Sequence, residues 1–427
     1  MEKIIINNGY LEYQINDVVE IINIKGKDVE KLLTKLIIIT NHLNKNYLNK
    51  SNVDLSNYNF INNVLSHDHY YIKRFIKIGN YETGELNNLC DVKGIKVAHA
   101  TIHKQPYHTG LTLIKPISDN IFLNKVVAAS YAFNGFGKSI GLLQIDELGT
   151  IETNIALTST LNVTKVASGM VEEILKENPE IGESTGTVNP IVLECNDGTL
   201  NKSRDMIVGH DDYVYCLNHF NNNFLQGDVG AGSGMICHGL KGGIGSSSRI
   251  IRIGDVEYHL AILVNSNFGE SRARDFILKG KEMGPLIASN DELLEEKGSI
   301  VAVVATDAPL NERQIKRVLK RVEMGIARTG SYAGNGSGDV FIGFSTANRR
   351  EHFNKEATSF ALFLSDNNIN PFFKACVDMT QEAIYNSMFF SHHLVGYHKE
   401  VKCLMEYHQL FDELLDGEII WKKSGIN

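Results

Sequence analysis

The hydrophobic positions of this chain form several uninterrupted apolar runs of strand length, each ending in polar turn residues. The two clearest are HLAILVNSNFG at 259–269 and GSIVAVVATDAP at 298–309. Runs of this length, bounded by Gly, Asn, Asp or Pro, are typical of buried strands. The same reasoning predicts strands at 126–133, 150–160 and 190–195, and a short strand pair over 89–102 that turns at Gly94.

Other segments repeat their apolar residues with the period of a helix. In 165–176 the apolar residues gather on one side, and 311–329 has an apolar face opposite a basic, solvated face. Asn311 followed three residues later by Gln314 predicts the N-cap of the second helix. Helices are also predicted at 28–42 and over much of 352–427. This mixed order of strands and helices predicts an α+β fold in layers rather than a doubly wound sheet.

The composition describes a globular protein with a sizeable core. Of the 427 residues, 43% are hydrophobic and 22% are charged, as in ordinary folded domains. The net charge of −8 argues against a nucleic-acid-binding surface. The longest unbroken apolar run, Ile300–Ala305, is too short to span a bilayer. We therefore expect neither a nucleic-acid partner nor a membrane partner.

The cysteine spacing and a change of composition along the chain predict the location of the protein and its domain boundaries. Six cysteines are scattered without the spacing of a zinc site or a disulfide scaffold, and the N-terminus lacks the features of a signal peptide. We expect a cytoplasmic protein without a structural metal. The Asn-, Lys- and Ile-rich segment 1–70 is interpreted as an accessory piece, 71–390 as the core, and 391–427 as a helical tail.

A dense glycine cluster stands out at Gly230–Arg249, GAGSGMICHGLKGGIGSSSR, with seven glycines running into three serines. Glycine is useful where φ is positive or where another group approaches closely. A plain loop would also have this composition. A phosphate-binding loop fits poorly, because the glycines do not give GxGxxG and Lys241 is followed by Gly242 instead of Ser or Thr.

A serine in this cluster lacks an evident histidine base, since His238 is the one histidine near it in sequence. One alternative base is the serine's own α-amine, released when the preceding peptide bond is cut. An α-amine titrates at about 7.7–8, against about 10.4 for lysine, so part of it is neutral at pH 7. Gly245 before Ser246 supplies the backbone freedom that such a cut requires.

The core resembles the L-aminopeptidase/D-esterase family, which includes β-peptidyl aminopeptidases and nylon-oligomer hydrolases. Seven pieces match in the family's order over roughly residues 76–350, and seven in order are far more specific than one motif. They are CDVKGIKVAHATI, FNGFGKSIG, NDGTLN, GAGSGMICHGLKGGIGSSSR, LVNSNFG, VAVVATDAPL and ARTGSYAGNGSGDVFIGFST. The resemblance implies a four-layer α/β/β/α sandwich and a self-cleaving hydrolase that needs no cofactor or metal.

The resemblance also implies roles for individual residues. The precursor is expected to cleave itself between Gly245 and Ser246, and Ser246 then forms the acyl-enzyme; Ser247 and Ser248 remain alternatives for the nucleophile. Asn201, which ends NDGTLN, is the expected oxyanion donor. The expected hydroxyl and acid beside the nucleophile's amine are those of Thr306 and Asp307.

An acidic pair, Asp146 and Glu147, matches the position expected to hold the free amine of the substrate. The family often has a tryptophan before this pair and a tyrosine after it. Here Leu148 follows, and the single tryptophan is Trp421. Loss of that tyrosine hydroxyl would remove a substrate contact or an oxyanion donor.

The predicted function is therefore an aminopeptidase that hydrolyses short peptides, amides or esters with a free amine. Substrates with α-amino groups, β-peptides and nylon-type oligomers stay open as alternatives. A catalytically weakened relative that acts as a binding or scaffold module is a second alternative, favoured by Leu148 and opposed by the intact GGIGSSSR. By resemblance, a homo-oligomer of the cleaved pairs is expected.

Overall fold

The computed structural model describes residues 78–269, 275–287 and 297–407, and the backbone of three strands near the N-terminus. By their contacts the residues form two units, Ile78–Met405 and a second made of Met1–Lys77 with Glu406–Asn427. The second unit contains an antiparallel sheet of β1 (Lys3–Asn7), β2 (Tyr10–Ile15) and β3 (Val18–Asn23).

The predicted domain plan compares with these units only in part. The boundary predicted near residue 70 and the helix predicted at 28–42 lie outside the described residues. The contacts group 391–405 with the larger unit, and the boundary at 390 stays a prediction.

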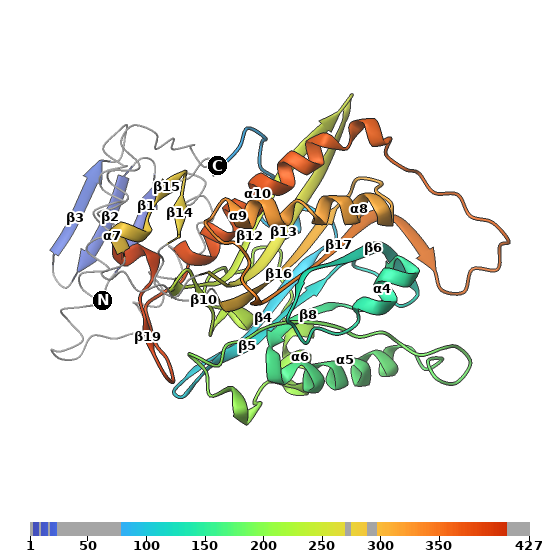
Figure 1. Ribbon diagram of the computed structural model, residues 1–427, viewed down its shortest axis with the longest axis horizontal. Coiled ribbons are helices and arrows are strands. Elements are labelled where there is room, and N and C mark those ends of the chain that lie inside the picture. The colour runs from blue at the N-terminus through green and yellow to red at the C-terminus, as the bar shows by residue number, and fades with distance from the viewer. Residues whose placement is uncertain are drawn as a thin grey trace. The chain divides into compact units, whose positions relative to one another are not determined.

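Two sheets form the centre of the larger unit (Figure 1). The four-stranded sheet has the order β4-β5-β8-β9, antiparallel except for the parallel pair β8 and β9. Its strands are β4 (Lys96–Lys104), β5 (Tyr107–Lys115), β8 (Ile155–Ser159) and β9 (Ile191–Cys195).

The six-stranded sheet has the order β12-β13-β16-β17-β6-β7. Only β16 and β17 run parallel, and the other neighbours are antiparallel. Its strands are β12 (Gly243–Ile253), β13 (Val256–Asn267), β16 (Lys297–Thr306), β17 (Gly336–Glu351), β6 (Asn124–Gly135) and β7 (Thr150–Ile151).

Helices cover the outer face of each sheet (Figure 1). The four-stranded sheet carries α5 (Val163–Glu177) and α6 (His210–Leu217). The six-stranded sheet carries α8 (Glu312–Leu319) and α10 (Asn370–Phe389), and α9 (Val322–Ala327) packs on α10. The predicted α/β/β/α sandwich of the α+β class is confirmed. The remaining regular segments are α4 (Leu142–Leu148), α7 (Gly284–Ile287) and the two-residue strands β10 (Ile236–Cys237), β11 (Leu240–Lys241), β14 (Ile277–Leu278), β15 (Lys281–Glu282), β18 (Leu394–Val395) and β19 (Glu400–Val401).

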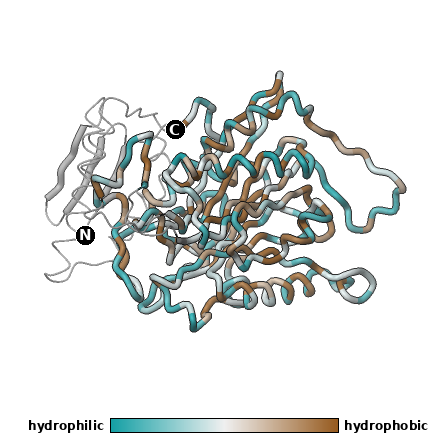
Figure 2. Tube along the Cα trace, viewed as in Figure 1, coloured by the Kyte–Doolittle hydropathy of each residue, from teal (hydrophilic) through white to brown (hydrophobic). Residues whose placement is uncertain are grey.

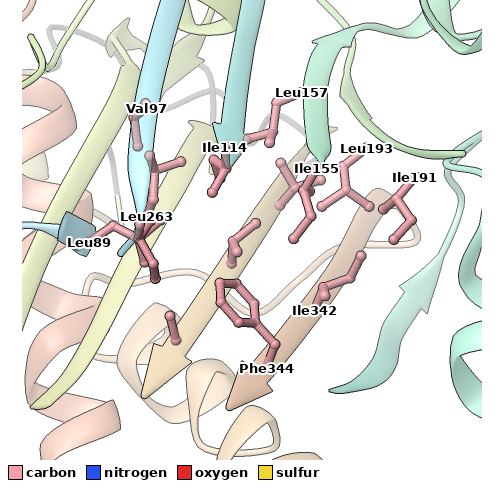
Figure 3. Packing of buried hydrophobic residues seen from close by; sticks show 14 of the residues in the cluster. Leu89, Val97, Ile114, Ile155, Leu157, Ile191, Leu193, Leu263, Ile342 and Phe344 are labelled. Atoms are coloured by element: carbon pink, nitrogen blue, oxygen red, sulfur yellow. The ribbon is translucent and has the colours of Figure 1, made fainter. Parts of the chain in front are cut away.

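The apolar faces of the two sheets meet in a single buried core. Alternate residues of β16, from Val301 to Ala305, point into it from one sheet, and Ile191, Leu193 and Cys195 of β9 point into it from the other. Figure 3 shows Leu193 and Ile191 facing Ile342 and Phe344 across this layer. The hydrophobic segments concentrate in the interior strands (Figure 2). The odd-numbered residues of β16 therefore point between the two sheets, as Val301, Val303 and Ala305 do.

Some predicted helices and strands differ from the structure, because a turn interrupts the apolar pattern from which they were predicted. The segment predicted as one helix over 311–329 is two helices, α8 and α9, although its N-cap is confirmed because Asn311 and Gln314 exchange hydrogen bonds of 2.9 and 3.1 Å. The strand pair predicted over 89–102 is a 3-10 turn followed by β4 alone. In 352–407 only α10 is an α-helix.

Candidate active site

Ser246 lies in the middle of β12, in unbroken antiparallel register with β13. Its hydroxyl donates to Ile262 O at 2.6 Å and accepts from Leu89 N at 2.9 Å. Its amide donates to the Gln226 side chain at 2.7 Å, and its carbonyl accepts from Asn386 at 2.7 Å. The hydrogen-bonding groups of this fully buried serine are thus all engaged in holding the strand.

The small residues around Ser246 allow helix α10 to lie against β12. A Cβ on Gly245 would stand 1.8 Å from Ala383 O of α10. The hydroxyl of Ser247 donates to Met379 O of the same helix at 2.8 Å. Ser248 donates to Asp91 on the other side of the strand. Close packing by α10 therefore accounts for Gly245 and Ser247, and strand and loop contacts hold the hydroxyls of Ser246 and Ser248.

Thr306 and Asp307 end β16 and bond to His259 of β13. The Thr306 hydroxyl donates to His259 O at 2.6 Å, and Asp307 accepts from His259 N at 2.7 Å. Ser246 is level with Val303 through Leu263, so Thr306 lies about 10 Å farther along the sheet. The structure gives both predicted residues partners on β13 and does not set them against Ser246.

The predicted acidic pair lies on the exposed side of the short helix α4. Asp146 forms an ion pair with Lys316 of α8, and Glu147 and Leu148 are exposed. At Asp146 the predicted amine-binding carboxylate is thus already paired with a lysine of the chain itself. The role of this pair in substrate binding stays a prediction.

Asn201 is buried in the turn that follows β9. Its side-chain amide donates to Asp197 Oδ2 at 3.0 Å, and its oxygen accepts from His108 N at 3.3 Å. These bonds tie the turn to β5. The predicted oxyanion role of Asn201 is untested by these contacts, which give it a structural one.

A second glycine–serine pair, Gly298–Ser299, begins the buried strand β16. Gly298 has φ of +138°, where residues with a side chain are rarely found, and a Cβ there would stand 2.0 Å from Asn267 O. Ser299 shares the parity of Val301, so its side chain points between the sheets. Its hydroxyl is buried and has no hydrogen-bond partner among the described residues. A buried hydroxyl without a partner is rare and calls for an explanation.

Two side chains approach Ser299 from β13 and β9. Asn267 is its register partner in β13, and the Asn267 amide is held at both ends, with Nδ2 donating to Asn196 O at 3.0 Å and Oδ1 accepting from Ile236 N at 2.9 Å. Cys195 ends β9 in the opposite sheet. Burial raises the pKa of the Cys195 thiol, and the Ser299 hydroxyl lies close enough to oppose that rise, although the geometry of the two groups is not that of a hydrogen bond.

A hydroxyl and a carboxylate lie beside Ser299 on the parallel strand β17. The Ser337 hydroxyl donates to Asp339 Oδ1 at 2.7 Å, and the same oxygen accepts from Ile300 N, the amide after Ser299, at 3.3 Å. Gly298 pairs with Ser337 in the register, and Ile300 pairs with Asp339. A hydroxyl and an acid therefore occupy β17 just before and just after Gly338, the register partner of Ser299, and the acid bonds to the amide that follows Ser299.

Ser299 and its neighbours were not among the site residues predicted from the sequence. Its signals were present, since Gly298–Ser299 opens the most apolar strand, Asn267 ends LVNSN, and Ser337 and Asp339 form the SGD of the second glycine loop. The three-serine motif drew the assignment to Ser246. Only the strand register brings Asn267, Ser299 and Asp339 to one end of the six-stranded sheet.

Residues 87–402, most of the chain, match peptidase family S58. This chain belongs to peptidase family S58. It is 32% identical over 341 residues to the beta-peptidyl aminopeptidase BapA of Sphingosinicella xenopeptidilytica, covering 73% of this chain and 83% of that protein. The corresponding enzyme of Sphingosinicella microcystinivorans is 28% identical, with 73% and 84% covered.

Several solved structures are also similar to this chain. A protein of Pyrococcus horikoshii OT3 matches with TM-score 0.75 and 42% identity, over 79% of this chain and 96% of that one. A Burkholderia sp. beta-aminopeptidase matches with 0.74 and 28%, over 82% and 99%. The L-aminopeptidase D-Ala-esterase/amidase of Ochrobactrum anthropi, described as a prototype serine aminopeptidase with a variant Ntn-hydrolase fold, matches with 0.74 and 27%, over 81% and 98%.

These findings confirm the prediction of an aminopeptidase of the N-terminal-nucleophile type with a serine nucleophile. Across the described ranges, no helix combines the length and apolarity that crossing a bilayer requires. All six cysteines lie in the described part of the chain, where they are buried and form no disulfide.

Proposed function

We propose that this S58 member is a self-processing aminopeptidase whose nucleophile is Ser299, and that it hydrolyses short peptides, amides or esters with a free amine. The observation that carries the proposal is the buried, unpartnered Ser299 hydroxyl directly after a left-handed glycine. Asn267 flanks it on one strand, and the Ser337–Asp339 pair flanks it on the next. Nucleophile, oxyanion donor and acid are the parts that acyl transfer requires.

The first reaction is cleavage of the chain's own Gly298–Ser299 bond. Ser299 Oγ adds to the Gly298 carbonyl carbon, the C–N bond breaks, and the hydroxyl proton passes to the departing nitrogen. That nitrogen becomes the α-amine of Ser299, and Gly298 is left as an ester on Oγ. Water then hydrolyses the ester, which releases the Gly298 carboxylate and restores the hydroxyl. The positive φ of Gly298 supports attack by a neighbouring side chain that an ordinary strand conformation disfavours.

The new α-amine then serves as the base in turnover. It accepts the hydroxyl proton as Oγ attacks the substrate carbonyl, and it returns a proton to the leaving amine or alcohol. Asp339 accepts a hydrogen bond from Ser337 and from Ile300 N, the amide that follows Ser299, and we expect it to orient the new amine once the chain is cut. Asn267 supplies a neutral amide donor for the oxyanion.

Ser246 is the competing assignment, and its contacts favour a structural role. Its hydroxyl already donates to Ile262 O, whereas the Ser299 hydroxyl has no such bond in the described part of the chain. A nucleophile at Ser246 would have to break that strand-holding bond first. The assignment to Ser246 remains a prediction until the cut bond is known.

The substrate and assembly are proposed from the relatives. The two curated relatives are named beta-peptidyl aminopeptidases, which supports β-peptides as substrates beside ordinary short peptides. A homo-oligomer of cleaved pairs is proposed on the same family grounds, and a cytoplasmic location on the buried cysteines, which form no disulfide in the described part of the chain.

The test compares Ser299→Ala with Ser246→Ala, each made as the full chain. Self-cleavage is followed on a denaturing gel and turnover with alanyl p-nitroanilide. We expect Ser299→Ala to remain one chain and to release no nitroaniline, while Ser246→Ala is cut and active in its folded fraction. The reverse pattern would return the nucleophile to Ser246.

A further inference from the structure

The turn that follows β9 connects a buried carboxylate to the proposed oxyanion donor. Asn196 forms the start of this turn, and its side chain accepts from Gly198 N at 2.9 Å. Its main-chain oxygen accepts from Asn267 Nδ2 at 3.0 Å. The position of Asn196 O therefore sets the direction in which the Asn267 amide points.

Asp197, the next residue, anchors the turn from inside. It is 1% exposed, and Oδ2 accepts from Asn201 Nδ2 at 3.0 Å. The main-chain oxygen of Asp197 accepts from Asn201 N at 2.9 Å, which closes the turn on itself. Asn201 in turn accepts from His108 N of β5 at 3.3 Å. The carboxylate thus orients the Asn201 amide so that its oxygen faces β5.

The surroundings leave Asp197 little freedom to move. A Cβ on Gly234 would stand 2.7 Å from Asp197 Cβ, so the glycine-rich stretch packs directly on this side chain. Its second oxygen is buried without a hydrogen-bond partner among the residues the structure describes. Burial raises the pKa of Asp197 to about 6, against the opposing effect of the Thr109 hydroxyl and the Asn201 amide, with Glu194 adding to the rise. Burying a carboxyl group that is only partly hydrogen-bonded costs folding free energy, which suggests that its hydrogen bond to Asn201 has a function.

We propose that Asp197 is a positioning residue for catalysis: by holding Asn201 and the turn, it fixes Asn196 O and through it the Asn267 amide beside Ser299. This inference rests on the proposed function, because it assumes that Asn267 serves the reaction at Ser299. The Asp197–Asn201 bond holds the turn, and the Asn196–Asn267 bond orients the proposed oxyanion donor. A shift of about 1 Å in a positioning group can slow an enzyme about 100-fold.

The proposal makes hydrogen-bond acceptance, rather than negative charge, the property that matters. Asp197→Asn keeps the size of the side chain and one acceptor oxygen for Asn201. Asp197→Ala removes the acceptor and leaves the turn held by main-chain bonds alone. We expect Asp197→Ala to lower kcat for alanyl p-nitroanilide by about 10- to 100-fold, with KM within about twofold. Asp197→Asn is expected to stay within about threefold of wild type.

A double-mutant cycle with Asn267→Ala tests the route of the effect. Asn267→Ala alone is expected to lower kcat by about 100- to 1,000-fold, as for loss of one oxyanion donor. If Asp197 acts through Asn267, adding Asp197→Ala to Asn267→Ala slows the enzyme by less than about twofold more. Rates are taken per cleaved chain, measured on the same gels, so that incomplete processing does not enter kcat.

Each result decides for or against the proposal. If the rate losses of Asp197→Ala and Asn267→Ala multiply in the double variant, Asp197 does not act through Asn267. If Asp197→Asn is as slow as Asp197→Ala, the reaction depends on the charge or the proton of Asp197. Normal kcat in Asn267→Ala would overturn the inference while leaving Ser299 as nucleophile, which the Ser299→Ala chain tests separately. Where Asp197→Ala does not fold, Asn201→Ala removes the other end of the same bond and replaces it in the cycle.

Discussion

The pairs Gly245–Ser246 and Gly298–Ser299 share a local sequence and differ in every contact that matters. At the first pair, glycine makes room for α10 and the serine hydroxyl is tied to Ile262 O. At the second, glycine takes up a left-handed φ and the serine hydroxyl is left without a partner in the described structure. Glycine before serine is therefore not by itself a sign of chemistry. The backbone conformation and the state of the hydroxyl separate the two.

The largest expected effect comes from the carboxylate beside the second pair. Asp339→Asn removes the acid that bonds to Ser337 and to Ile300 N. We expect cleavage and turnover to fall by about 100- to 10,000-fold, the usual contribution of a positioned acid or base. Asp307→Asn is the matched control, since Asp307 bonds to His259 at the far end of the same strand. Equal losses of cleavage and turnover in both variants would contradict the assignment of the catalytic acid to the Ser299 end of β16.

A comparable effect, but on stability alone, is expected beside the first pair. Arg249 and Glu382 form a buried ion pair at 2.5 Å between β12 and α10, and Glu382 also accepts from Asn87. Glu382→Ala leaves the arginine charge buried, which costs about 3–5 kcal/mol of unfolding free energy. Denaturant unfolding measures it, and Arg252→Ala, which breaks an exposed pair on the same strand, is expected to leave the midpoint unchanged.

The glycines themselves give the next test. Gly298→Ala puts a Cβ in a left-handed position against Asn267 O, so cleavage is expected to slow at least about 100-fold. Gly245→Ala instead pushes against Ala383 O of α10 and is expected to cost about 1–3 kcal/mol of stability. The check is cleavage rate and thermal midpoint for both variants. A Gly245→Ala chain that folds normally but is not cut would favour the first pair as the reactive one.

The smallest expected effect is a pH dependence in the glycine-rich stretch before Ser246. The Asp228 carboxylate raises the pKa of His392, 2.9 Å away. A histidine with a raised pKa stabilises the fold fully below its unfolded pKa of about 6.5, and the stabilisation is lost as pH rises through the folded pKa. His392 is half exposed, so the loss is expected to stay below about 1 kcal/mol. Thermal midpoints of wild type and His392→Gln, compared between pH 5.5 and 8.5, measure it; a steeper pH dependence in the variant would contradict the sign.

The sequence predicted the layers well, whereas its assignment of the reactive serine to Ser246 stays a prediction. Apolar runs such as 259–269 and 298–309 are local signals, and they became β13 and β16. The four-layer arrangement came from the resemblance and was confirmed. The helix break after Leu319 and the single strand after Gly94 depend on tertiary packing, which the spacing of apolar residues along the sequence does not reveal.

The site depends on strand order and register, which no local motif contains. Asn267, Ser299 and Asp339 come from three strands, and they meet because β13, β16 and β17 are neighbours with fixed pairing. Asp146 and Glu147 lie on the exposed side of a helix, where Asp146 is paired with Lys316, and their predicted role in binding the substrate amine stays a prediction. Sequence cannot separate a reactive Gly–Ser pair from one selected by close helix packing, because both uses favour small residues such as Gly245 and Ser247.

The position of the chain break tests the central claim most directly. Intact mass and N-terminal sequencing of the purified wild-type protein identify the bond that has been cut. We expect a new N-terminus at Ser299, in the sequence SIVAVVATDAP. A new N-terminus at Ser246, or a chain that is active and uncut, would contradict the account.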